Sequence, residues 1–337
     1  MKKLMNQPGD FVDQSLKGIV AAHPNDYMFC NGDIRAIACA RKPPVNQTVI
    51  VTGGGFGHLP VFLGYVGQGL CDGVAVGNVF TSPSCESILN VSRQVHAGGG
   101  ILFLFGNYTG DGMNFSMAKE FLSMENIQAE IVTVSDDVAS APREKYEERR
   151  GIAGIAFAYK VAGACAQCQH PLEEVKRIAK KTIENTATYG VAFSSCTLPD
   201  IGKPMNEMGE NEMEVGMGIH GEPGVLRTSM RTSAALAQEL TSALLNDLSA
   251  RSGDRMAVLV NGLGATSREE LYIFYNDVAP LLSQAGIQVH SVYVGEYATS
   301  LEMAGASLSL LKLDDELTQY LDMDAFSPFI SFRSLIR

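Results

Sequence analysis

Three short segments of β-branched or apolar residues, each ending at a loop of glycine or polar residues, constrain the fold of this chain most strongly. The segments with their loops are 48–51 with 53–58, 101–105 with 106–111, and 131–134 with 135–137. Apolar runs without alternation are typical of strands that are covered on both faces. The pattern therefore predicts an α/β fold with a largely parallel sheet flanked by helices.

The pattern changes after an amphipathic helix expected over residues 172–188. Apolar residues then alternate with Glu and Gly over 212–219, which is the period of a strand with one exposed or lined face. A helix over 233–249 and strands at 256–260, 289–294 and 308–311 are expected to complete this half. The chain has 337 residues, more than one hydrophobic core usually serves. We therefore expect two domains, an α/β domain over 1–188 and an α+β domain over 189–337.

Charge and composition exclude several classes of protein. The net charge is −11, whereas a nucleic-acid binder needs a basic surface, so direct nucleic-acid binding is not expected. No apolar run approaches about 18 residues, and no apolar signal-peptide core follows the first residues, so no membrane association or export is expected. Seven cysteines without framework spacing fit a reduced cytoplasm.

Neither a metal site nor a cofactor is expected from the sequence. Cys165 and Cys168 form a C-x-x-C, but they lie near the end of an apolar helical run and no second ligand pair follows. The glycine loop at 53–58 lacks the third glycine of a dinucleotide fingerprint, since Pro60 stands there. No P-loop occurs either, so the chain carries no recognisable nucleotide site.

Three loops contain residues that could carry chemistry. In the first, Gly55, Phe56, Gly57 and His58 follow a strand, and its glycines allow a ligand to approach the backbone closely. A tight turn with an incidental histidine is the alternative. In the second, Asp111 could accept hydrogen bonds from hydroxyls or act as a base. Taken alone, Asp111 is explained more simply as a helix cap.

The third loop places His220 between glycines, in the sequence Gly-Ile-His-Gly-Glu-Pro-Gly at 218–224. Flanking glycines leave the ring nitrogens open, and a neutral imidazole is a competent nucleophile toward a carbonyl. A histidine that merely satisfies a turn is the alternative.

Taken together, these motifs resemble the substrate-binding K subunit of dihydroxyacetone kinases. The resemblance extends over nearly the whole chain and includes residues 22–24, 64–69, 80–83, 107–111, 211–214, 218–224 and 263–266. It implies that His220 holds dihydroxyacetone as a covalent hemiaminal, with His58 and Asp111 in acid/base roles. It also implies a substrate site that includes Gly55, Phe56, Gly57 and Gly106. The family resemblance further implies a homodimer without its own nucleotide, served by an ADP-bearing L subunit.

Three positions depart from the family pattern. Phe56 replaces a serine, Leu59 a glutamate, and Gly106 a lysine that contacts substrate in the family. Loss of a cation weakens phosphoryl transfer, whereas hemiaminal formation needs only an imidazole and a carbonyl. The sequence therefore favours a family coactivator, which senses dihydroxyacetone and engages a transcription factor controlling the kinase operon. The alternatives are the K subunit of a phosphoenolpyruvate-dependent kinase, or a kinase subunit for a related ketose.

Overall fold

The computed structural model describes residues 3–222 and 224–333. The helices are η1 Pro8–Asp10, α1 Phe11–Ala22, η2 Leu63–Tyr65, α2 Cys85–Val95, α3 Thr109–Met124, η3 Arg143–Glu148, α4 Ile155–Gln167, α5 Leu172–Glu184, α6 Ser233–Asp247, α7 Arg268–Gln284 and α8 Asp315–Leu321. The strands are β1 Tyr27–Cys30, β2 Asp33–Cys39, β3 Val49–Phe56, β4 Gly73–Val79, β5 Ile101–Gly106, β6 Ala129–Val134, β7 Thr186–Ala192, β8 Glu212–Val215, β9 Leu226–Ser229, β10 Arg255–Gly262, β11 Gln288–Gly295, β12 Gly305–Leu313, β13 Ala325–Phe326 and β14 Ser331–Phe332.

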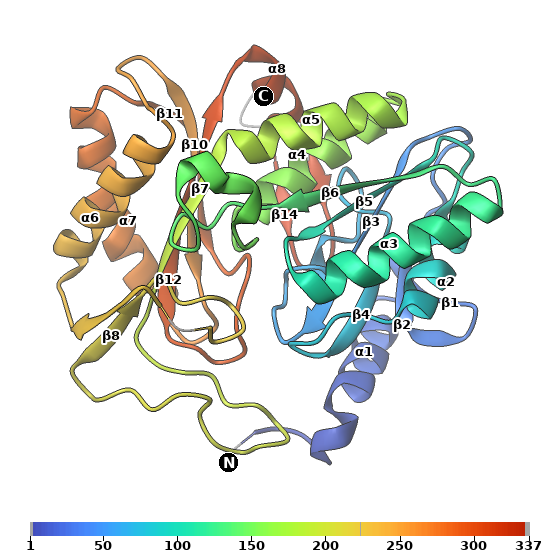
Figure 1. Ribbon diagram of the computed structural model, residues 1–337, viewed down its shortest axis with the longest axis horizontal. Coiled ribbons are helices and arrows are strands. Elements are labelled where there is room, and N and C mark those ends of the chain that lie inside the picture. The colour runs from blue at the N-terminus through green and yellow to red at the C-terminus, as the bar shows by residue number, and fades with distance from the viewer. Residues whose placement is uncertain (1–2, 223, 334–337) are drawn as a thin grey trace.

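The first sheet has the order β1-β2-β4-β3-β5-β6 (Figure 1). Strands β4, β3, β5 and β6 are parallel to one another. Strand β2 pairs with β4 in antiparallel fashion, and β1 pairs with β2 in antiparallel fashion. Side chains of α2 and α3 pack on one face of this sheet, and those of α1, α4 and α5 pack on the other. The predicted largely parallel sheet flanked by helices is confirmed.

The second sheet has the order β11-β10-β12-β7-β8-β9, and only its β10–β11 pair is parallel. Helices α6 and α7 cover one face of it. Its other face contributes Leu259 and Leu311 to the hydrophobic cluster that contains α4 and α5. Helices α4 and α5 therefore lie between the two sheets (Figure 1). The mixed α+β character expected for the second half is confirmed.

The boundary expected at residue 188 falls within β7, the first strand of the second sheet. The C-terminal segment returns to the first half, where Phe326 and Gln68 exchange two backbone hydrogen bonds of 2.9 and 3.0 Å. The shared hydrophobic cluster and this return make the contact between the halves extensive. A division into two separately folding domains stays a prediction.

The strand expected to run to His220 is shorter than its alternating pattern indicated. Strand β8 ends at Val215, because Gly216 adopts a left-handed φ of 75°. Glu214, expected on the wetter face, is buried and accepts hydrogen bonds from Arg227 and from the Gly224 backbone. The first strand of the second half was expected at 191–196. The structure places this strand, β7, earlier, from Thr186 to Ala192.

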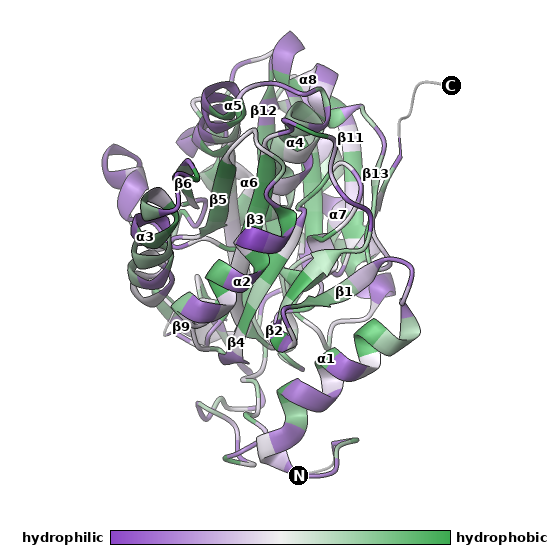
Figure 2. Ribbon diagram, turned by 90° about the vertical axis from the view of Figure 1, so that its right-hand side faces the viewer, coloured by the Kyte–Doolittle hydropathy of each residue, from purple (hydrophilic) through white to green (hydrophobic). Residues whose placement is uncertain are grey.

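The distribution of hydropathy agrees with this arrangement. The strands at the centre of Figure 2 are mostly hydrophobic, whereas α1 and α5 carry hydrophilic residues along their length. Within the described part of the chain, no helix has the length and apolar character needed to cross a bilayer.

Candidate functional site

The site forms where the two halves of the chain meet. His58 follows β3 of the first sheet, and His220 follows β8 of the second. Their ring centroids lie 4.7 Å apart, with the ring planes at 76°. Phe80 stacks on His58 at 4.7 Å, and the edge of Tyr108 meets His220 at 4.5 Å. The structure thus brings two of the predicted site residues together inside an aromatic enclosure.

His58 is fully buried, and its hydrogen bonding determines which ring nitrogen is free. Its Nδ1 lies 2.7 Å from the carbonyl oxygen of Thr299. A carbonyl oxygen only accepts, so Nδ1 carries the proton and Nε2 keeps its lone pair. Among the described residues Nε2 has no hydrogen-bond partner. Burial, with a smaller contribution from His220, lowers the pKa of His58 to about 3. His58 is therefore a neutral imidazole with an unused acceptor.

His220 is held at two points by one carboxylate. Its Nδ1 lies 3.2 Å from Oε1 of Glu222, and its backbone N–H donates to Oε2 at 3.0 Å. Burial by itself would raise the pKa of Glu222, but the hydrogen bond from His220 and the nearby charge of Arg150 hold it at about 2. Glu222 is thus an anion that engages Nδ1, which leaves Nε2 of His220 as the nitrogen able to attack a ligand.

Asp111 lies in the first turn of α3, close enough to His220 for their charges to interact. The helix begins after Tyr108 without a side-chain cap, and Oδ1 of Asp111 has no partner among the described residues. The capping role considered from sequence is therefore not the one its side chain plays. Burial raises the pKa of Asp111 to about 6, against the opposing effects of Ser82 and His220. A carboxyl group with this pKa can take or give a proton near neutral pH.

The glycines of the first loop make room for Phe80. A Cβ on Gly55 would lie 2.7 Å from Cα of Phe80, and one on Gly57 would lie 2.8 Å from its ring. Phe80 itself has a left-handed φ of 58°. The close approach that the glycines permit is thus made by Phe80, which holds its ring against His58.

Side chains alternate along a strand, so Phe56 points to the side of β3 opposite to the one where Gly55 and Gly57 face Phe80. Its ring meets Phe11 of α1 edge-on at 5.9 Å. Together with Leu59, Ser15 and Ile19 it lines a groove of about 610 Å³ between α1 and the glycine loop. The structure therefore places two of the three departures from the family pattern, Phe56 and Leu59, away from the His220 ring.

Gly106, the third departure, lies beside the site. A Cβ at this position would lie 3.1 Å from the ring of Tyr108, the same ring that packs against His220. The Tyr108 hydroxyl donates to the Gly151 carbonyl at 3.0 Å, which anchors the ring there. A side chain at residue 106 would therefore press on a wall of the His220 site.

A loop over residues 193–211 of the second half contacts the segment that carries His220. The Asn206 amide donates to the carbonyl oxygen of Gly221 at 3.1 Å. Met205 lies 3.4 Å from where a Cβ on Gly221 would stand, and its sulfur is 3.6 Å from Cys196 Sγ. This loop therefore touches the residue that follows His220.

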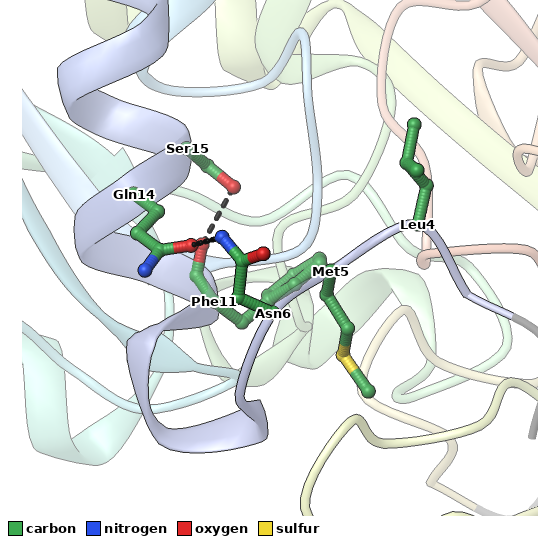
Figure 3. A pocket seen from close by; sticks show the side chains of 6 residues that line it. All are labelled: Leu4, Met5, Asn6, Phe11, Gln14 and Ser15. Carbon is green, nitrogen blue, oxygen red and sulfur yellow. Dashed lines mark hydrogen bonds between the residues drawn. The ribbon is translucent and has the colours of Figure 1, made fainter.

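A separate cavity of about 320 Å³ lies between the N-terminal segment and α1 (Figure 3). Asn6 donates to Gln14 at 2.7 Å, and Ser15 donates to the Phe11 carbonyl at 2.6 Å. None of the site residues predicted from sequence lines this cavity. Across the described residues, no group of three or more His, Cys, Asp or Glu side chains is placed to hold a metal ion.

Sequence reasoning identified the two histidines and Asp111 but missed much of what surrounds them. Phe80, Tyr108 and Glu222 occur in the motifs quoted for the resemblance, so their positions were a usable signal. Thr299 carried no signal, because it acts through its backbone carbonyl, which every residue type possesses.

This fold, with a histidine from each half facing the other, can be compared with known proteins. The chain belongs to the Dak1 domain family, whose model matches residues 17–329. It is 42% identical, over 98% of this chain and 99% of the relative, to the dihydroxyacetone-binding subunit DhaK of a PTS-dependent dihydroxyacetone kinase from Listeria innocua. It is also 42% identical to an L-erythrulose kinase of Pectobacterium atrosepticum, over 97% of this chain but 56% of that longer protein.

Solved structures of both a kinase and a coactivator resemble this chain along its length. The dihydroxyacetone kinase of C. freundii superposes with a TM-score of 0.89 at 30% identity, covering all of this chain and 62% of the kinase. The dihydroxyacetone kinase operon co-activator Dha-DhaQ superposes with a TM-score of 0.88 at 29% identity, covering 96% and 98% of the two chains. The fold is therefore common to a kinase and a coactivator, and does not distinguish between them.

Proposed function

We propose that this chain captures a small hydroxyketone covalently on His220 and presents it for phosphorylation, as the ligand-binding subunit of a two-component kinase. The observation that carries the proposal is the pair of facing imidazoles, each with Nδ1 engaged and Nε2 left for a ligand. Dihydroxyacetone is the first candidate ligand. A four-carbon ketose is the second, since an erythrulose kinase is among the relatives.

The capture step is an addition to the carbonyl group. Nε2 of His220 supplies the electron pair that forms the bond to the carbonyl carbon. The π pair of the C=O bond moves to oxygen, which takes a proton from water, and the Nδ1 proton of the imidazole, bonded to Glu222, neutralises the hydroxide that remains. No net proton is consumed, and the product is a neutral hemiaminal. Glycerol has no carbonyl group and is excluded by the chemistry of this step.

Two arguments favour a kinase subunit. Phe56 and Leu59 pack toward α1, so they do not remove chemistry from the His220 site. Among the described residues Asp111 keeps an unpartnered oxygen and has a pKa of about 6, which suits it to take or release a proton. The neutral His58 keeps an unpartnered Nε2 that can accept a hydrogen bond from a ligand hydroxyl. The superposed structures favour neither role, since the identity is 30% to the kinase and 29% to the coactivator.

A coactivator of the kinase operon is the second candidate, and Gly106 is the observation that favours it. Without a cation at residue 106, this chain has less means of stabilising charge during phosphoryl transfer. In that case the bound ketone is a signal, and the protein partner is a transcription factor instead of an ADP-bearing L subunit. In either role we place the chain in the cytoplasm as a homodimer, without direct contact to DNA.

A coupled phosphorylation assay separates the two roles. The chain is combined with dihydroxyacetone and a phosphoryl-donating L subunit, and a known active K subunit serves as the positive control. Turnover near the control is expected. Absence of turnover, in a sample where mild intact-mass analysis detects the adduct, would overturn the kinase role and leave the coactivator. Absence of both adduct and turnover, for dihydroxyacetone and erythrulose alike, would overturn the capture proposal itself.

A further inference from the structure

The segment after β11 touches the loops of both histidines. The Thr299 carbonyl accepts from Nδ1 of His58 at 2.7 Å, and the Leu301 N–H donates to the Gly57 carbonyl at 2.7 Å. On the other side, the Ser300 hydroxyl donates to the carbonyl oxygen of Ile219 at 2.5 Å. Ile219 directly precedes His220. Two adjacent residues therefore connect His58 and His220 through one short piece of backbone.

Ser300 is itself held firmly, so it can restrain the loop to which it bonds. Its side chain is fully buried, and its backbone N–H donates to the Leu263 carbonyl at 3.0 Å. Leu301 next to it holds a left-handed φ of 50°, so the segment is bent tightly at this point. The hydroxyl also meets the Cys196 thiol, but its short bond is the one to Ile219, and a buried bond of this kind restrains the His220 loop against the Ser300 backbone.

We infer that Ser300 is a positioning residue, which sets the spacing of His220 relative to His58 by binding the Ile219 carbonyl. The inference rests on the proposed capture of a ketone on His220. Without the Ser300 hydroxyl, the His220 loop is attached to this segment less firmly, while His58 keeps its bond to Thr299. The ketone then reacts with a His220 ring whose position relative to His58 is less well fixed.

The test compares Ser300→Ala with two matched variants. Ser309→Ala removes another fully buried serine hydroxyl, one that accepts from Thr188 within the second sheet. Thr182→Val removes a buried threonine hydroxyl that donates to the Ile178 carbonyl at 2.8 Å within α5, away from the site. For each variant, thermal unfolding is recorded beside the dissociation constant for dihydroxyacetone and the amount of adduct by mild intact-mass analysis.

For Ser300→Ala we expect about tenfold weaker binding, whereas both controls bind within about twofold of the unmodified chain. Nitrogen-15 spectra of the histidine rings should still show the Nδ1–H form of His58 in all three variants. Equal binding by Ser300→Ala and Ser309→Ala, in samples where the unmodified chain forms the adduct, would overturn the inference. Lack of any adduct in the unmodified chain would instead overturn the proposed function. If Ser300→Ala does not fold, Ser300→Cys keeps a weaker donor and gives the same comparison.

Discussion

The ring centroids of His58 and His220 lie 4.7 Å apart although 161 residues separate the two histidines in the chain. They differ in surroundings: His58 is fully buried, while the side chain of His220 is 19% exposed. The buried ring is suited to a fixed hydrogen-bond acceptor, and the more accessible ring to an attacking group. This division of roles leads to the following predictions.

Replacing His220 by alanine should abolish the covalent adduct, because the attacking nitrogen is removed. The measurement is intact-mass analysis under mild conditions after incubation with dihydroxyacetone. His290→Ala is the control, since His290 is a half-buried histidine on β11, outside the site, that bonds to Asp322 at the end of α8. Retention of the adduct in the His220 variant would show that another residue captures the ketone.

His58 should make the protein less stable in acid. Its pKa of about 3 in the folded chain lies below the value of about 6.5 expected in the unfolded chain. Between these values the unfolded chain binds a proton that the folded chain does not, so stability is lost as the pH falls from about 6.5 toward 3. The loss from this group is roughly 4–5 kcal/mol at about 1.4 kcal/mol per pH unit.

The comparison for that prediction is His58→Asn, which keeps a donor for the Thr299 carbonyl but does not titrate. Asp111 acts in the opposite sense, because its raised pKa of about 6 lets the folded chain bind a proton first. The unmodified chain and His58→Asn both contain Asp111, so the contribution of Asp111 cancels when their losses of stability are compared. Urea unfolding at pH 7 and pH 4.5 should show a smaller loss for His58→Asn. Equal losses would contradict the assignment of a depressed pKa.

Asp111 should set the pH at which turnover begins. If its ionised carboxyl takes the proton of a substrate hydroxyl, turnover should rise as the pH increases through about 6 and then level off. Asp111→Asn should lower turnover by about 100-fold or more and leave no such rise. Glu120→Gln, on the exposed side of the same helix, is the control. A normal pH profile in Asp111→Asn would assign the proton transfer to another group.

Phe56→Ser should reduce stability without weakening ketone binding. Phe56 is 6% exposed and packs on Phe11, so its truncation should cost about 3–5 kcal/mol of unfolding free energy. Its side chain points away from Phe80 and the His220 ring, so the dissociation constant should change less than twofold. Urea unfolding and a ligand titration on the same preparation test both statements. A large change in affinity would mean that Phe56 reaches the ligand after all.

The sequence predicted the sheets better than the site. The apolar runs at β3, β5 and β6 indicated buried parallel strands, because burial on both faces removes alternation. The alternation around Met213 misled, since Gly216 ends the strand and Glu214 is buried by its pairing with Arg227. Those effects depend on contacts made only in the folded chain.

The site residues show the same limit. His58, Asp111 and His220 stood out because they lie in motifs that together resemble one family; taken alone, Asp111 was explained more simply as a helix cap. Phe56 appeared to be part of the substrate surface, and only the direction of its side chain along β3 places it against α1. Ser300 could not have been singled out, because its partner is a backbone carbonyl 81 positions away in the chain.

The position of α4 and α5 between the two sheets also bears on how a ketone enters and leaves. One apolar cluster contains side chains from these helices and from both sheets, so swinging the halves apart would expose that cluster to water. Access by a hinge is therefore energetically unfavourable. Exchange of the ketone should instead depend on local motion of the loop around Met205 and Asn206, which lies over Gly221. Residence time would then follow the mobility of that loop more than the stability of the whole fold.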